Sequence, residues 1–195
     1  MNSHQDLSPQ RVSIGPGEIY SSAGATVIQT LLGSCVAACM YDPINKVYGM
    51  NHFLLAIQKA KSKSTLLNSR EGYYGIHAME LLINALLKKG AKRQNLKAKI
   101  FGGGNVLRQF SNNQQSFYDI GRYNIEFVVE YLKNERIPIV ASSVGSDYGR
   151  IIFFDPSDFS VYQKRISHAQ EVSVASEELR YVETKKQNVG QVQLW

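Results

Sequence analysis

Two apolar runs that lie close together in the chain constrain the fold more than any other feature. They span residues 35–41 and 47–55, and the five residues between them read DPINK. Asp-Pro followed by Asn is typical of a turn, so the two runs predict a β-hairpin. A two-residue loop would pair Cys35 with His52 on one face of the sheet. A longer loop would move the partner of Cys35 to residue 53 or 54, and a slip of one residue would change the face.

The rest of the hydrophobic pattern predicts two main helices and several short strands. Apolar residues recur at helical spacing within residues 74–89 and 118–134, which favours a helix in each segment. The expected strands lie at residues 26–32, 96–101, 137–142, 151–154 and 159–166. Hairpin-like connections outnumber strand–helix–strand alternations, so we expect an α+β fold with a mixed or antiparallel sheet.

Length and composition favour one domain with polar ends. We expect a polar N-terminal arm at residues 1–10, a single domain at 11–165 and a loosely attached polar tail at 166–195. Of the 195 residues, 44% are hydrophobic, which is enough to bury an ordinary core. The chain has no apolar run of membrane-spanning length and no apolar signal core near its N-terminus. We therefore expect a cytoplasmic protein without membrane insertion.

Charge and cysteine content narrow the choice of partners and cofactors. The formal net charge of +6 would tolerate an acidic protein partner. Basic residues form only short clusters, and no nucleic-acid-binding motif is recognisable, so we do not expect a nucleic-acid partner. Cys35 and Cys39 are expected to be reduced thiols. They lack a third Cys or His at ligand spacing, so we do not expect a metal site.

The predicted hairpin brings together the two residue types that thiol catalysis needs. An imidazole beside a thiol can hold it as the nucleophilic thiolate, so Cys35 and His52 are candidate catalytic residues. Gly33 and Ser34 interrupt the apolar pattern just before Cys35. Backbone N–H groups without strand partners at this break could stabilise an oxyanion. The alternative is that both side chains are ordinary core residues, as we expect for Cys39.

An ordered series of motifs over residues 11–165 resembles the CheD family, the chemoreceptor glutamine deamidases. The matching pieces are IGPGE at 14–18, TLLGSCVAAC at 30–39, DP at 42–43, GMNHFLL at 49–55, YG at 74–75, AMELLIN at 78–84, GA at 90–91, AKIFGGG at 98–104, IG at 120–121, Asn124, and residues 145–150 with Phe154. The order of so many pieces makes the resemblance more specific than any one motif.

The resemblance implies a complete activity. Cys35 would attack the side-chain carboxamide of specific glutamines on receptor cytoplasmic helices, with His52 as its partner. A thioester would form, ammonia would leave, and water would release glutamate. The implied fold is a layered α/β sandwich similar to the catalytic domains of bacterial deamidating toxins, without a metal or an organic cofactor. The implied partners are the methyl-accepting chemotaxis receptors and, in some members, a phosphatase of the chemotaxis response regulator.

One position departs from the family pattern. The third catalytic residue of the family is a threonine six residues before the cysteine, where this chain has Gln29, while Thr30 lies five before it. Adjacent strand residues point to opposite faces. Thr30 could serve after a local adjustment, Gln29 could orient His52 through its carboxamide oxygen, or the third role could be lost. We name Thr30 as the third residue.

Two other functions remain open at this point. The departure at Gln29 leaves room for a non-catalytic or weakly catalytic adaptor that binds receptors or a chemotaxis phosphatase. A generic cysteine hydrolase of small amides would instead turn over free glutamine.

Overall fold

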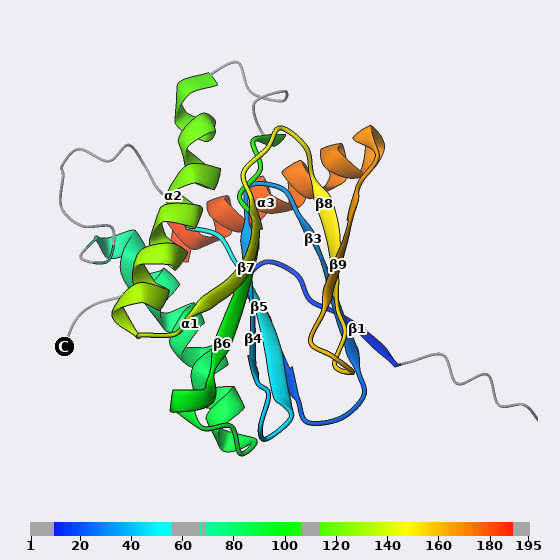
Figure 1. Cartoon of the computed structure of the whole chain (residues 1–195). Helices are drawn as coiled ribbons and strands as arrows, with labels where there is room; N and C mark the ends of the chain where they lie inside the picture. Colours follow the sequence, from blue (N-terminus) through cyan, green and yellow to red (C-terminus); the bar gives the residue numbers. More distant parts are fainter. Residues whose placement is uncertain (1–9, 56–66, 68, 107–113, 189–195) are drawn as a thin grey trace, which may run out of the picture.

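The computed structural model of the chain describes residues 10–55, 67, 69–106 and 114–188. It consists of two β-sheets stacked face to face, with helices on the outer face of one of them (Figure 1). The expected N-terminal arm lies almost entirely outside the described residues. Within the described part of the chain, no helix combines the length and the apolar character that a membrane crossing requires.

Both sheets are mixed. The four-stranded sheet has the order β1-β3-β8-β9 and consists of β1 (Arg11–Ser13), β3 (Val27–Leu32), β8 (Arg150–Phe154) and β9 (Val161–Arg165). The five-stranded sheet has the order β2-β5-β4-β6-β7 and consists of β2 (Ile19–Ser22), β5 (Val47–Phe53), β4 (Val36–Asp42), β6 (Lys97–Gly102) and β7 (Ile139–Val144). The pairs β1–β3 and β6–β7 are parallel, and every other pair is antiparallel.

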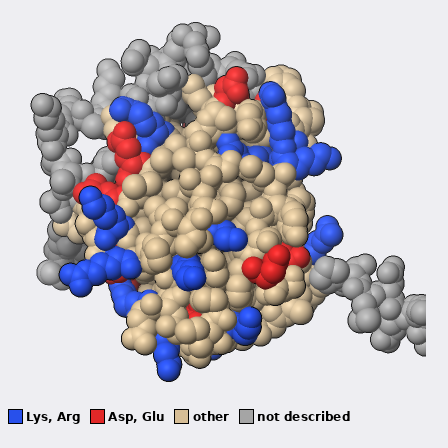
Figure 2. All heavy atoms as spheres, in the orientation of Figure 1, with Lys and Arg blue, Asp and Glu red and all other residues tan. Residues whose placement is uncertain are grey.

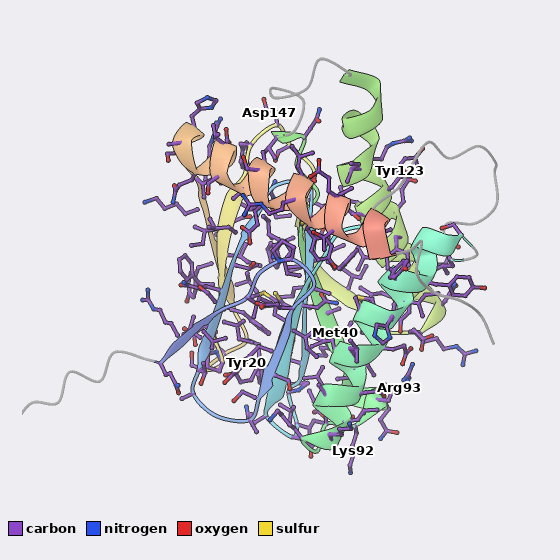
Figure 3. The ribbon with its side chains drawn as sticks, turned by 180° about the vertical axis from the view of Figure 1, so that it is seen from behind. Tyr20, Met40, Lys92, Arg93, Tyr123 and Asp147 are labelled. Atoms are coloured by element: carbon purple, nitrogen blue, oxygen red, sulfur yellow. The ribbon has the colours of Figure 1, made fainter. Side chains whose placement is uncertain are left out.

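In the described part of the chain, three α-helices complete the layers, and a short 3₁₀ helix (Arg93–Asn95) precedes β6. Helices α1 (Arg70–Lys88) and α2 (Gln114–Asn134) pack on the five-stranded sheet. Ser69 caps the start of α1 by accepting a hydrogen bond from the Gly72 N–H, which satisfies one of the free donors at a helix start. Helix α3 (His168–Asn188) runs across the strands toward α2, as seen from behind in Figure 3.

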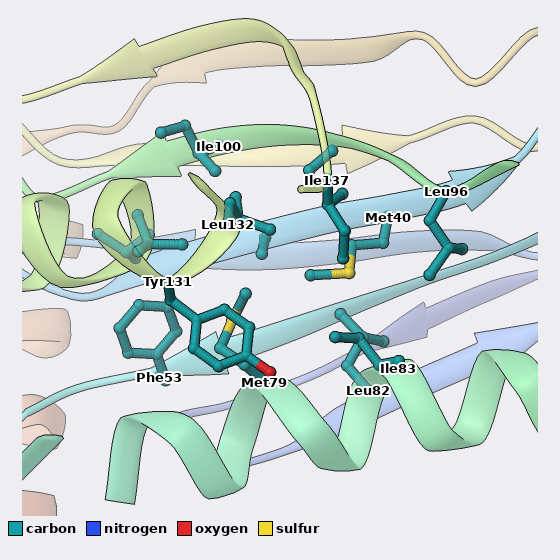
Figure 4. Packing of buried hydrophobic residues seen from close by; sticks show 14 of the residues in the cluster. Met40, Phe53, Met79, Leu82, Ile83, Leu96, Ile100, Tyr131, Leu132 and Ile137 are labelled. Carbon is teal, nitrogen blue, oxygen red and sulfur yellow. The ribbon is translucent and has the colours of Figure 1, made fainter. Parts of the chain in front are cut away.

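The hairpin β4–β5 lies between two hydrophobic cores, which explains why both runs are apolar throughout. Every residue of β4 and β5 is buried. Cys35, Ala37 and Cys39 face the core between the two sheets. Val36, Ala38 and Met40 face the core beneath α1 and α2, part of which is shown in Figure 4. A strand that is buried on both faces needs apolar residues at successive positions rather than an alternating pattern.

The predicted fold class is confirmed. The structure is an α+β layered fold with mixed sheets. The predicted strands correspond to β3–β9, and the two predicted helices correspond to α1 and α2, although both helices begin four residues earlier, at residues 70 and 114.

The direct pairing of Cys35 with His52 is wrong. His52 pairs with Ala37, and the loop has four residues rather than two. The Asp42 side chain explains the longer loop, because its Oδ1 accepts hydrogen bonds from the N–H groups of Ile44 and Asn45. The shift moves the partner of His52 by two residues, which preserves the face. Cys35 and His52 therefore stay on the same side of the sheet.

The expectation of a loose C-terminal tail is also wrong for most of that segment. Residues 168–188 form α3, and Val174, Ala175 and Val182 of this helix are buried. The segment has a polar average composition because its outer face is solvated. Only a narrow stripe, which also includes Glu171 and Glu178, is buried among the described side chains of the helix. Such a stripe is typical of a helix at the surface of a domain.

Core packing beneath α1 gives a direct test of this arrangement. Leu82 is fully buried between α1 and the sheet, whereas its neighbour Leu81 is 42% exposed. We expect Leu82→Ala to lower the free energy of unfolding by about 3 kcal/mol, because it removes buried methyl groups and leaves a cavity. Leu81→Ala should change it by less than about 0.5 kcal/mol. Urea denaturation of both variants measures the difference, and equal losses would contradict the described orientation of α1.

Candidate active site

Thr30 and His52 are in direct contact. Thr30 is buried on the inner face of β3, and its Oγ1 lies 2.8 Å from Nδ1 of His52 on β5. The same hydroxyl donates a hydrogen bond to the Ile14 carbonyl at 2.7 Å. A hydroxyl has one proton to donate, so Oγ1 must accept from Nδ1–H. This fixes the tautomer of His52 and leaves a free lone pair on Nε2.

Gln29 does not contact His52. It faces away from the inter-sheet core, and its Nε2 donates to Ser13 Oγ at 2.7 Å. The alternation of β3 explains the difference, since Ile28, Thr30 and Leu32 are buried while Gln29 is only half-buried. Of the two candidates for the third residue, the structure therefore brings Thr30 to the imidazole.

His52 lies in a small cluster of reactive side chains. Cys35 Sγ, a ring nitrogen of His52 and a carboxylate oxygen of Glu178 all lie within 4.8 Å of one another. All three residues are buried. Nε2 of His52 has no hydrogen-bond partner among the described residues. A buried nitrogen that lacks a partner is destabilising. Its lone pair is free, so it is available to take a proton from the thiol.

The break before Cys35 presents a row of backbone donors. The N–H groups of Gly33, Ser34 and Cys35, called here the N–H cluster, all point to the carboxylate of Glu178. Its Oε1 accepts from Gly33 at 3.0 Å and from Cys35 at 3.1 Å. Its Oε2 accepts from Ser34 N–H at 3.0 Å and from Ser34 Oγ at 2.6 Å. Gly33 and Ser34, expected to support an oxyanion, thus supply donors that already hold a negatively charged oxygen pair.

Contacts to the three carbonyl groups hold the N–H cluster in this orientation. The carbonyls of Gly33 and Cys35 accept from the N–H groups of Gly104 and Gly103, and the Ser34 carbonyl accepts from Asn124 Nδ2. A Cβ atom on Gly102 would lie 2.2 Å from the Cys35 carbonyl oxygen, so a larger residue there would push this segment away. The role of the GGG motif is therefore close packing against the break.

The segment before β2 supports His52 from the other side. The Gly17 N–H donates to the His52 carbonyl at 2.7 Å, and the His52 N–H donates to the Glu18 carbonyl at 3.0 Å. Gly17 has a φ of 85°, a conformation that favours glycine. A cavity of about 250 Å³ lies beside this segment and is lined by His52, Thr30, Pro16 and Glu177 among others.

Burial keeps Cys35 and His52 uncharged in this conformation. Desolvation raises the pKa of the Cys35 thiol well above its usual value, and the nearby charge of Glu178 raises it further. Desolvation also lowers the pKa of His52 to about 4. A neutral thiol therefore faces a neutral imidazole, and proton transfer between them requires the approach of a stabilising group or a change in burial.

Cys35, His52 and Glu178 could together supply three ligands to a metal ion. The two oxygens of Glu178 already accept four hydrogen bonds from residues 33–35. Metal binding through this carboxylate would have to compete with those bonds. The Glu178 oxygens are therefore better placed to accept hydrogen bonds than to bind a cation.

Sequence reasoning missed Glu178 and its contacts. The apolar residues Val174, Ala175 and Val182 occur at helical spacing on either side of Glu178. This spacing was the one signal in the sequence that a helix face is buried there. The polar composition of the segment concealed that spacing. Asn124 belonged to the family motifs, but its position behind Ser34 could not be derived from the sequence pattern.

Comparison with known proteins identifies the family. The family model described as CheD chemotactic sensory transduction matches residues 54–165. A protein of Shewanella oneidensis named probable chemoreceptor glutamine deamidase CheD 2 is 53% identical over 180 residues, which cover 91% of this chain and 89% of that protein. The chain belongs to the CheD family.

Further CheD proteins support this assignment over nearly the whole chain. A probable chemoreceptor glutamine deamidase CheD 1 of Geobacter sulfurreducens is 43% identical over 173 residues, covering 88% of this chain and 86% of its own. The probable chemoreceptor glutamine deamidase CheD of Thiobacillus denitrificans is 39% identical over 188 residues, covering 95% and 90%. The alignments extend well beyond residues 54–165, so they include the segments that form the site.

The lowered pKa of His52 predicts a loss of stability in acid. Between about pH 6.5 and pH 4 the unfolded chain binds a proton at His52 that the folded protein does not, so stability falls as the pH falls through this window. From pH 7.5 to pH 4.5 we expect His52 to account for a loss of roughly 2 to 3 kcal/mol. Urea denaturation at both pH values, on the wild type and on His52→Gln, measures this part. An identical pH dependence in the two proteins would contradict it.

Proposed function

We propose that this CheD protein is a cysteine-dependent chemoreceptor glutamine deamidase, with Cys35 as nucleophile, His52 as base and Thr30 as the residue that orients His52. The names of its relatives support the substrate and the reaction. The observation that carries the proposal is the N–H cluster beside Cys35, which already binds the carboxylate of a glutamate side chain. The substrate of a glutamine deamidase has the same length and shape.

The first half of the reaction forms a thioester. His52 Nε2 takes the proton of the Cys35 thiol, and the thiolate attacks the carbon of the glutamine carboxamide. The carbonyl oxygen becomes negatively charged, and the N–H cluster stabilises that charge. Protonated His52 then gives its proton to the departing nitrogen, so ammonia leaves and the acyl group stays on Cys35.

The second half returns the enzyme to its starting state. His52 takes a proton from water, and the resulting hydroxide attacks the thioester carbon. The N–H cluster stabilises the second oxyanion, the bond to sulfur breaks, and Cys35 leaves as a thiolate that recovers the proton from His52. The carboxylic acid that forms loses its proton, which the released ammonia takes up. The net change is one carboxamide and one water converted to one carboxylate and one ammonium ion.

Thr30 suits this cycle because it is uncharged. A carboxylate hydrogen-bonded to Nδ1 in place of the Thr30 hydroxyl would favour the charged form of the imidazole. The Thr30 hydroxyl fixes the tautomer through Nδ1–H without that effect, and therefore leaves Nε2 free to act as a base. This arrangement is the reason for naming Thr30 rather than Gln29 as the third residue.

The proposal includes the setting in which the enzyme acts. The substrates are glutamines on the cytoplasmic helices of methyl-accepting chemotaxis receptors, and the protein acts in the cytoplasm. A chemotaxis phosphatase is a proposed second partner. The net charge of +6 is compatible with an acidic receptor surface. On the face drawn in Figure 2 the basic side chains are spread around the surface rather than gathered in one patch.

The buried state of Cys35, which has no exposed surface, favours one second candidate. A protein whose site stays closed would bind receptors or the phosphatase and modify few glutamines, as a weakly catalytic adaptor. The two functions differ in turnover and not in binding.

Receptor modification is the direct test. We expect the wild type to raise the mass of a receptor cytoplasmic fragment by about one dalton per site, because a carboxamide becomes a carboxylate, and Cys35→Ala to give no gain. Cys39→Ala is the matched control, since this buried thiol contacts Met50 and not His52; it should keep the activity. Intact mass and peptide mapping give the readout. Binding without any mass gain by the wild type would favour the adaptor.

The third residue has its own test. We expect Thr30→Val to lower kcat roughly tenfold to a hundredfold, because Nδ1 loses its partner and the imidazole loses its fixed tautomer. Gln29→Ala should stay within about twofold of the wild type, since Gln29 contacts Ser13 and not His52. Initial rates of receptor deamidation at saturating substrate give kcat. The opposite ranking of the two variants would assign the role to Gln29.

A further inference from the structure

Glu178 has the chemical form of the reaction product. Deamidation converts a glutamine side chain to a glutamate side chain, and the Glu178 carboxylate lies within 4.8 Å of Cys35 Sγ and of His52. Its two oxygens accept every donor of the N–H cluster and the Ser34 hydroxyl as well. No other acceptor can use these donors while Glu178 is in place.

We propose that α3 is a built-in product mimic, in which Glu178 fills the subsite for the substrate carboxamide and α3 takes the place of the protein segment that carries the glutamine. This inference rests on the proposed deamidase function. It adds that a receptor segment must displace α3 before Cys35 can react, so the docking of α3 controls the activity.

Contacts along α3 hold Glu178 in the site. Ala175 and Val182, one turn before and one turn after Glu178, are buried in the core between the sheets. Glu171, two turns before it, is buried and accepts a hydrogen bond from the Gly149 N–H at 3.0 Å. Three successive turns of the helix thus contact the body of the protein on the same face as Glu178.

The close fit at Gly33 is consistent with a side chain that belongs in the subsite. A Cβ atom on Gly33 would lie 2.9 Å from Glu178 Oε1 and 2.6 Å from Val106 Cγ2. The absence of a side chain at residue 33 therefore allows the carboxylate to reach the N–H cluster. The same space would admit the carboxamide of a substrate glutamine, which has the same number of heavy atoms.

A carboxylate binds this subsite better than a carboxamide does. Both oxygens of a carboxylate accept hydrogen bonds, whereas a carboxamide has one accepting oxygen and a nitrogen that only donates. A carboxamide oxygen at the position of Oε1 would keep the bonds to Gly33 and Cys35. Its nitrogen, at the position of Oε2, could donate to Ser34 Oγ, but it would leave the Ser34 N–H without an acceptor. That pose keeps the carboxamide in the cluster with Cys35 and His52, with the departing nitrogen beside a hydroxyl.

The decisive experiment introduces a substrate into α3. We expect the introduced amide of Glu178→Gln to be hydrolysed by the protein itself, with one water consumed and one ammonia released. The variant then becomes chemically identical to the wild type and gains about one dalton with time. Glu178→Gln combined with Cys35→Ala should keep its amide. Glu177→Gln is the matched control, because Glu177 makes no contact with the N–H cluster among the described residues; it too should keep its amide.

The outcomes separate this inference from the proposed function. Conversion that requires Cys35 and is confined to residue 178 supports the product mimic, even if no receptor fragment is modified. An amide that persists in a folded Glu178→Gln variant that still deamidates the receptor overturns the product mimic and leaves the deamidase intact. An amide that persists while the receptor is also unmodified overturns both.

A second pair of variants tests the docking of α3 without changing Glu178. Val174→Asp places a charge on the buried face of α3, and Val172→Asp places it on a side chain that is 40% exposed. We expect Val174→Asp to speed iodoacetamide labelling of Cys35 by about tenfold or more, because labelling is limited by the fraction of molecules with α3 displaced. Val172→Asp should leave the rate unchanged. Melting curves confirm that both variants fold, and equal labelling rates in folded variants overturn the proposal.

Discussion

The rest of the site depends on how the chain is held at residues 33–35. Each of the three carbonyl groups is held by a donor from behind, from Gly104, Asn124 and Gly103 in turn. A peptide group has its donor and its acceptor on opposite sides. The Gly33 carbonyl shares a peptide group with the Ser34 N–H, and the Ser34 carbonyl shares one with the Cys35 N–H. Fixing these two carbonyls therefore aims two of the three donors of the N–H cluster at one place beside the Cys35 thiol. Donors that need no reorganisation are the most effective form of oxyanion stabilisation.

The proposed mechanism also needs an uncharged, oriented base. Thr30 provides this with a single hydroxyl, because the hydrogen bond that it donates to Ile14 forces it to accept from His52. Burial lowers the pKa of His52 to about 4 and raises the pKa of Cys35. The closed site therefore holds a neutral pair next to the charge of Glu178. Displacement of α3 would remove that charge and admit water, and both changes favour the thiolate.

The sequence predicted the proximity of Cys35 and His52 correctly, although the predicted hairpin register was wrong. The pairing of Cys35 with His52 was wrong by two residues, yet the two side chains still meet, because a shift of two preserves the face of a strand. The choice between Gln29 and Thr30 depended on which side of β3 faces inward. That choice is made by the pairing of β3 with β8 and by the core beneath it, and neither can be derived from two adjacent residues.

The sequence by itself determined the strands, two of the helices, the α+β class and the cysteine–histidine pair, because these follow from local periodicity, turn chemistry and short spacing along the chain. Only the tertiary structure decided that Glu178 binds the N–H cluster and that Asn124 holds Ser34 from behind. Both contacts join residues about 90 or more positions apart. Contacts of that kind depend on how whole layers pack together. The polar composition of α3 gives little indication that one face of this helix is buried.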